Sequence, residues 1–135
     1  MKKSSYYKGM FLVAGLWNLV LAVPSWLGTL IMPESSSRIF GMAPPAVLFP
    51  YHAMFWFVMA FGVGYLIVSR DITKNHGIVT IGIIGKTLFF IDCLITLILK
   101  QANVVLLLIG IGDLIFACLF LEFLLYARGK NHTTD

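Results

Sequence analysis

The stretch VVLLLIGIGDLIFACLFLEFLL, residues 104–125, decides the fold class of this chain. It contains only two charged side chains, Asp113 and Glu122. A helix needs about 20 apolar residues to cross the roughly 30 Å hydrocarbon layer of a bilayer. The apolar residues here are continuous, whereas the strands of a membrane β-barrel alternate between apolar and polar residues. The stretch therefore predicts a membrane-spanning helix.

Four apolar runs of this length are present, at about residues 10–32, 47–69, 77–99 and 104–126. Prolines and serines end the first run, and prolines keep the next stretch out of a helix. We expect this longest link, residues 33–45, to lie on the membrane surface. The other two links are short and polar, so neighbouring helices are antiparallel. The sequence predicts one all-α domain over residues 1–135, a four-helix transmembrane bundle with up-down-up-down topology.

The composition supports an integral membrane protein. Of the 135 residues, 59% are hydrophobic and 12% are charged, against about 45–50% and about 25% in soluble domains. A soluble monomer would expose too much apolar surface, and a disordered chain would be polar and poor in aromatic residues. The net charge of +4 comes from basic residues scattered over chain ends and turns. The predicted partner is therefore the lipid bilayer, not a nucleic acid.

The lysines and arginines predict the orientation of the chain in the membrane. Seven of them lie at the N-terminus, in the second link or in the C-terminal tail, and two lie in the other links. Loops on the cytoplasmic side carry the excess of basic residues. We therefore expect both termini to be cytoplasmic.

Four ionisable side chains lie inside the predicted spans: Lys86, Asp92, Asp113 and Glu122. Each costs about 2.5–3.5 kcal/mol near the bilayer centre, so each should turn away from lipid. Small and polar residues recur at helical spacing, which is typical of helix contacts in membranes. These stripes are Ala14, Asn18 and Ala22; Ala60 and Gly64; Gly82, Lys86, Phe89 and Cys93; and Gly110, Asp113 and Ala117.

Lys86 and Asp113 are expected to meet inside the bundle. Their depths differ by roughly 6 Å at 1.5 Å per residue, a distance that a lysine stem can cover. Two interpretations remain open: an ion pair that sets helix register with Asn18, or a mid-membrane site for a proton, an ion or a polar group. Asp92 lies about 120° around the helix from Lys86. It is either bonded to Thr96 or a carbonyl, or it belongs to the site as a relay or a cation site nearer the outside.

Other polar residues are assigned to the inner membrane surface. Tyr65, Arg70 and Asp71 form a predicted secondary cluster there, and Glu122 is expected to meet Arg128 or Lys74. No set of side chains has the spacing of metal ligands, and no catalytic motif is present. We therefore predict no metal and no cofactor, and the sequence favours a non-enzymatic role.

Three functions are compatible with these features. The first is transport of a proton, an ion or a small polar solute, or ligand binding, at Asn18, Lys86, Asp92 and Asp113. The second is an accessory subunit that packs on a larger membrane protein; a homo-oligomer is also open. The third is a bundle that binds or modifies a lipid or another hydrophobic ligand, with a cavity beside His52, Trp56 and Asp92.

Several short elements resemble a loose group of short bacterial membrane proteins with four spans. The elements are Gly15-Leu16-Trp17-Asn18, Gly64-Tyr65, Arg70-Asp71, Gly82-x-x-Gly85-Lys86 and Gly112-Asp113. The resemblance implies a location in the bacterial inner membrane. It also implies that one group of residues acts together: Asn18, Tyr65, Arg70, Asp71, Lys86 and Asp113.

Overall fold

The computed structural model describes residues 2–131, which form five helices and no strand. The helices are α1 (Lys2–Ile31), α2 (Pro33–Ile39), α3 (Phe49–Arg70), α4 (His76–Ile98) and α5 (Val104–Asn131). The four long helices are long and apolar enough to cross a membrane. The predicted all-α, four-span fold is confirmed.

The helix ends differ from the prediction at both termini. α1 begins at Lys2 instead of about residue 10, and α5 continues to Asn131 instead of about residue 126. The added turns contain no proline, and their apolar side chains are used in packing: Tyr7 is buried against α5, with its ring 5.2 Å from that of Phe123. Hydropathy marks where the apolar run ends, but these helices continue beyond it through side-chain contacts.

The link after α1 contains a short helix, α2, that the sequence did not predict. Pro33 ends α1 and occupies the first turn of α2, where a missing N–H group costs nothing. Gly41 follows α2 with a φ of +69°, a left-handed conformation that glycine adopts without strain. Beside it, Asn103 donates from its backbone N–H to the Phe40 carbonyl at 2.8 Å and from Nδ2 to the Ile39 carbonyl at 2.9 Å. α2 is thereby attached to the turn between α4 and α5.

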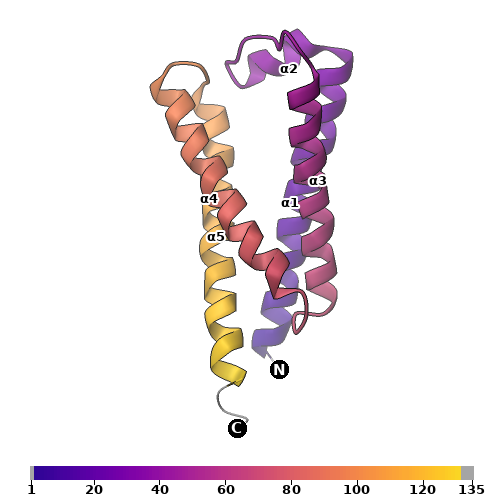
Figure 1. Cartoon of the computed structure of the whole chain (residues 1–135), viewed down its shortest axis with the longest axis vertical. Coiled ribbons are helices and arrows are strands. Elements are labelled where there is room, and N and C mark those ends of the chain that lie inside the picture. The colour runs from indigo at the N-terminus through magenta and orange to yellow at the C-terminus, as the bar shows by residue number, and fades with distance from the viewer. Residues whose placement is uncertain (1, 132–135) are drawn as a thin grey trace.

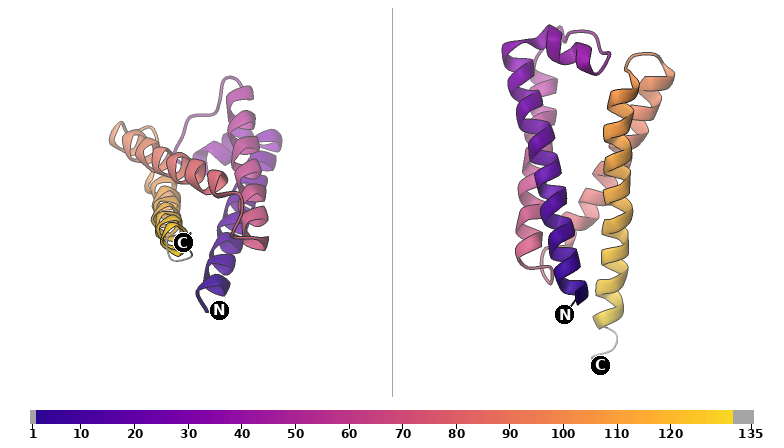
Figure 2. Two further views of the ribbon diagram at one scale, coloured as in Figure 1. Left: turned by 60° about the horizontal axis from the view of Figure 1, so that its bottom comes forward. Right: turned by 180° about the vertical axis from the view of Figure 1, so that it is seen from behind.

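The long helices are arranged as two antiparallel pairs, α1 with α3 and α4 with α5. Figure 1 and Figure 2 show the pairs close together at the end that carries both termini and separated at the other end, where α2 lies. Close packing of α1 on α3 depends on Gly15 and Gly62. A Cβ atom at Gly15 would lie 2.9 Å from the Gly62 carbonyl oxygen.

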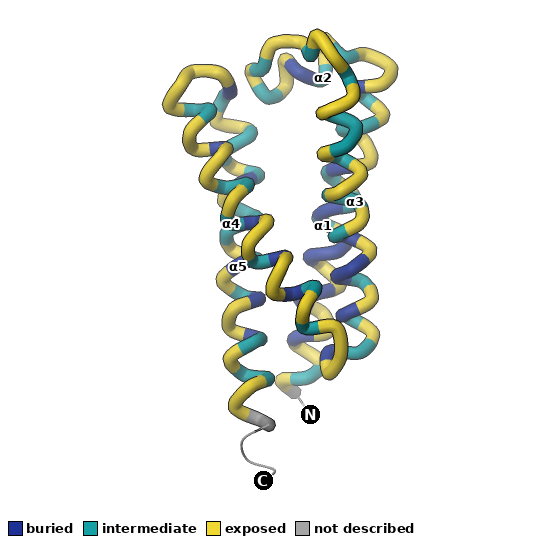
Figure 3. Tube along the Cα trace, viewed as in Figure 1, coloured by how far each residue is buried: buried dark blue, intermediate teal, exposed yellow. Residues whose placement is uncertain are grey.

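The buried core lies at the terminal end, where all four long helices contribute to it. Phe11 and Phe120 have ring centroids 4.9 Å apart, and the Phe120 ring lies 4.9 Å from that of Tyr65. In Figure 3 the buried segments face the space between the helices, and the outer surfaces are exposed. We call this cluster the terminal core; it contains Tyr7, Met10, Phe11, Ala14, Tyr65, Val68, Ile72, Val79, Phe120 and Phe123.

The predicted stripes of small and polar residues face inward, with one exception. The stripes of α1, α4 and α5 are buried or half-buried throughout. In α3, Gly64 is buried as expected, but Ala60 is exposed. Gly62 instead provides the close contact with α1. Of the predicted pair in α3, only Gly64 therefore faces inward.

Substitution of Gly15 should weaken the α1–α3 pair. Gly15→Ala places a methyl group against the backbone of Gly62, and overpacking of this kind costs about 1–3 kcal/mol. Gly9→Ala is the matched control, because a Cβ atom there meets nothing within 4 Å. Thermal unfolding in detergent, followed by tryptophan fluorescence, should show a lower midpoint for Gly15→Ala only. Equal midpoints would contradict close packing at Gly15.

Candidate functional site

Lys86 is the centre of a buried polar group inside the bundle. Its side chain is 4% exposed. Nζ donates to Asp113 Oδ1 at 2.6 Å and to Asn18 Oδ1 at 2.9 Å. The lysine, the carboxylate and the amide come from α4, α5 and α1 respectively. The structure therefore brings together three of the four residues proposed for the ligand or ion site.

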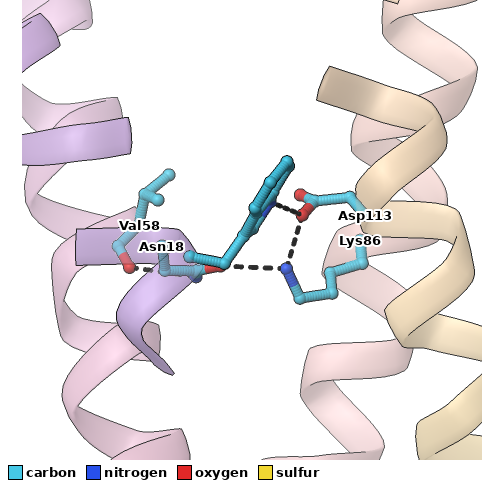
Figure 4. Close-up of polar contacts among 5 residues, drawn as sticks. Asn18, Val58, Lys86 and Asp113 are labelled. Carbon is cyan, nitrogen blue, oxygen red and sulfur yellow. Dashed lines mark hydrogen bonds and ion pairs between the residues drawn. The ribbon is translucent and has the colours of Figure 1, made fainter. Parts of the chain in front are cut away.

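Two further contacts complete this group. The indole N–H of Trp17 donates to Asp113 Oδ1 at 3.1 Å, and Asn18 Nδ2 donates to the Val58 carbonyl of α3 at 3.2 Å. Figure 4 shows Lys86 between Asn18 and Asp113, bridging the two helix pairs. We call Trp17, Asn18, Lys86 and Asp113 the polar centre. It links all four long helices through side-chain and backbone hydrogen bonds.

Two aromatic rings also lie near the lysine ammonium group. Nζ lies 5.5 Å from the ring centroids of both Tyr65 and Phe116. A cation within about 6 Å of a ring face is attracted by the ring quadrupole. Tyr65 reaches this position because Gly82 has no side chain: a Cβ atom there would lie 2.5 Å from the tyrosine hydroxyl.

A cavity of about 640 Å³ lies between the helix pairs, on the α2 side of the polar centre. Its floor includes the polar centre, and Ser36, Ser37 and Phe40 of α2 and its end contribute to the opposite wall. Most of its lining is apolar or aromatic, with hydroxyl groups from α1, α2 and α4. Aromatic lining residues include Trp17, Phe40, Tyr51, Phe55, Phe57, Phe61, Tyr65 and Phe89.

Asp92 lines the same cavity but lies apart from the polar centre. It is exposed on α4, six residues beyond Lys86, which is about 9 Å along the helix. Thr96 donates its hydroxyl to the backbone carbonyl of Asp92, not to its carboxylate. Of the four candidate residues, Asp92 is therefore the one that the structure separates from the other three.

The residues of the secondary cluster lie in two places. Tyr65 is buried in the bundle beside Lys86, whereas Arg70 is exposed at the end of α3. Asp71 belongs to the turn before α4, where it accepts hydrogen bonds from Thr73 and pairs with Lys74 at 3.3 Å. These contacts, the Thr73 hydroxyl foremost, lower the pKa of Asp71 to about 2. Tyr65 thus belongs structurally with the polar centre.

Trp17 was missed by the sequence reasoning as a polar partner. Tryptophan in a membrane helix usually indicates an anchor at the bilayer surface, but this indole packs inward against α5. A signal was present in Gly112, which precedes Asp113: a Cβ atom there would lie 2.7 Å from the Trp17 ring. A glycine next to an aspartate in a membrane helix can thus indicate that a large side chain packs there and donates to the carboxylate.

Glu122 has a different partner from the expected one. Tyr7 of α1 donates its hydroxyl to Glu122 Oε1 at 3.0 Å, and no ion pair to Arg128 or Lys74 is present among residues 2–131. The expectation was wrong because it assumed that the glutamate would reach the surface charges. The N-terminal extension of α1 places a neutral donor closer to it.

The cavity also differs from the one expected for a lipid-binding bundle. Asp92 lines it, but His52 and Trp56 do not. Trp26 instead packs against both, with ring centroids 6.4 Å from His52 and 5.2 Å from Trp56. These rings stabilise the α1–α3 pair on a face other than the cavity wall.

The chain is an integral membrane protein by the length and apolar character of its four long helices. No family model matches the chain, and no curated protein or solved structure matches it significantly. The features from which a function can be argued are the polar centre and the cavity that it borders.

Disruption of the ion pair should be more harmful than its complete removal. Lys86→Met leaves the Asp113 carboxylate unpaired, and Asp113→Asn leaves the ammonium group unpaired, each at a cost of about 3–5 kcal/mol. The double variant leaves neither charge, so its loss of stability should be well below the sum of the losses in the two single variants. The free energy of unfolding in mixed micelles, measured for all four proteins, gives the coupling. Additive losses would contradict a direct interaction.

Proposed function

We propose that this protein binds a small amphipathic molecule within the membrane, in the cavity above the polar centre. The observation that carries the proposal is the position of the polar centre in the cavity floor. An ion pair that served only helix register would be equally effective in a fully packed bundle.

The size and lining of the cavity support this function. Small-molecule sites are typically about 300–1,000 Å³ and mostly apolar, with a few polar groups that orient the ligand. The cavity here is about 640 Å³, with aromatic walls, the polar centre in its floor and a few hydroxyl groups along its sides. Such a site suits a molecule with an apolar body and one polar group directed at Lys86 and Asp113.

The polar centre retains hydrogen-bonding capacity for such a group. Both bonds that Asp113 accepts end on Oδ1, and within residues 2–131 no hydrogen bond reaches Oδ2. An ammonium group has three N–H donors, and Lys86 uses two of them. A ligand hydroxyl or carbonyl group can therefore bind at the cavity floor without breaking the ion pair.

The accessory-subunit alternative has weaker support. Exposed apolar residues occur on all four long helices, which is what contact with lipid alone requires.

A bulky residue at Gly85 should block ligand binding. Gly85 lines the cavity, and a Cβ atom there meets nothing within 4 Å, so the first side-chain atom of Gly85→Leu is accommodated without a clash. Gly77→Leu is the matched control, because Gly77 also faces open space but lies outside the cavity lining. The neutral aromatic probe triphenylmethanol, radiolabelled, should bind saturably to the wild type and Gly77→Leu in nanodiscs, and at least about tenfold more weakly to Gly85→Leu.

Protein-free nanodiscs provide the blank for probe dissolved in lipid. Native mass spectrometry of the purified protein should also detect a bound small molecule, and the bound fraction should be lower in Gly85→Leu. No saturable probe binding, or equal binding by both leucine variants, would refute the proposal.

Proton or ion transport is a second candidate, favoured by one observation. The Lys86–Asp113 pair lies between the cavity and the terminal core, so a conformational change that opened the core would expose the pair to the other side. Under this hypothesis proteoliposomes containing the wild type carry a proton or ion flux, and Lys86→Met abolishes it. Equal flux in both proteins, or no flux in either, would refute transport.

A further inference from the structure

The charges in the cavity lining indicate what charge its ligand carries, an inference that rests on the proposed binding function. Three side chains of the lining bear a formal charge: Lys86, Asp92 and Asp113. Lys86 and Asp113 neutralise each other at 2.6 Å. The lining as a whole therefore has one excess negative charge, which belongs to Asp92.

Asp92 has no protein partner for that charge within residues 2–131. No hydrogen bond and no ion pair reaches its carboxylate there, although its backbone carbonyl accepts from Thr96. Asp92 shares one face of α4 with other residues of the lining, at successive spacings of three, four, three and four residues. These residues are Gly82, Gly85, Phe89, Asp92 and Thr96. A ligand charge at Asp92 would lie about 9 Å above the level of Lys86 along α4.

The aromatic walls favour a cation over an anion. A ring face attracts a cation within about 6 Å of its centroid, and the lining contains rings from Phe55, Phe61 and Phe89. Lys86 already uses such contacts, with Tyr65 and Phe116 at 5.5 Å. An anion would meet the repulsion of Asp92 and the negative faces of the rings, in surroundings of low dielectric constant.

We propose that the ligand is a lipophilic monocation, whose charge pairs with Asp92 and whose apolar body fills the aromatic cavity. A cation of this kind offsets the one charge in the lining that the protein leaves unpaired.

Three aromatic probes of different charge test this proposal: the cation tetraphenylphosphonium, the neutral triphenylmethanol and the anion tetraphenylborate. Binding to the full-length protein in nanodiscs is measured against protein-free discs. Of the three probes, tetraphenylphosphonium should bind to the wild type with the highest affinity. Asp92→Asn preserves the shape of the side chain. It should lower the affinity for tetraphenylphosphonium by about tenfold and leave the affinity for triphenylmethanol unchanged.

Glu34→Gln is the matched control, because it removes one negative charge from an exposed residue of α2 outside the cavity lining. It should leave the affinities for all three probes unchanged. Equal tetraphenylphosphonium affinity in the wild type and Asp92→Asn, with triphenylmethanol still bound, would overturn this inference and leave the proposed function intact. The inference would also be overturned if the wild type bound tetraphenylborate more tightly than tetraphenylphosphonium. The same holds if Asp92→Asn lowered the affinities for tetraphenylphosphonium and triphenylmethanol equally. Failure of all three probes to bind would overturn the proposed function itself.

Discussion

The hydrogen bonds that join the Lys86–Asp113 ion pair to Asn18 and Trp17 of α1 are the interaction on which the arrangement of the two helix pairs depends. A charged side chain is costly in a bilayer unless it has a partner, and an unpaired buried charge costs more than the pair contributes. Lys86 and Asp113 both belong to the α4–α5 pair and bond to Asn18 and Trp17 of α1. Separation of the α4–α5 pair from the α1–α3 pair would therefore keep the ion pair but expose it to lipid.

The bundle is asymmetric about this interaction. At the terminal end the aromatic residues of the terminal core fill the space between the helix pairs, and Tyr7 and Glu122 add a hydrogen bond between α1 and α5. At the other end the pairs separate, and α2 is held to the α4–α5 turn by Asn103. Packing of one end and divergence of the other leave a cavity that ends at the polar centre.

Under the proposed function, this asymmetry gives the ion pair a role beyond helix register. Membrane helices associate through close packing of small residues and through hydrogen bonds, and the Gly15–Gly62 contact already supplies such packing to the α1–α3 pair. Helix register alone does not require a charge at the edge of a 640 Å³ cavity. Under the proposed function the ion pair has two roles. Through its bonds to α1 it helps to fix the two helix pairs, and it presents polar atoms to a ligand.

The sequence by itself determined the four spans, because a continuous apolar run in a bilayer must satisfy its own backbone hydrogen bonds as a helix. It also indicated that Asn18, Lys86 and Asp113 face inward, from helical spacing and from the cost of exposing charge to lipid. The same cost did not keep Asp92 from an exposed position on α4. Only the tertiary structure decided the rest: the helix α2, the bond from Trp17, the separation of Tyr65 from Arg70, and the cavity. These features depend on the angles at which helices cross, and such angles arise from the fit of whole surfaces, which no single stretch of sequence contains.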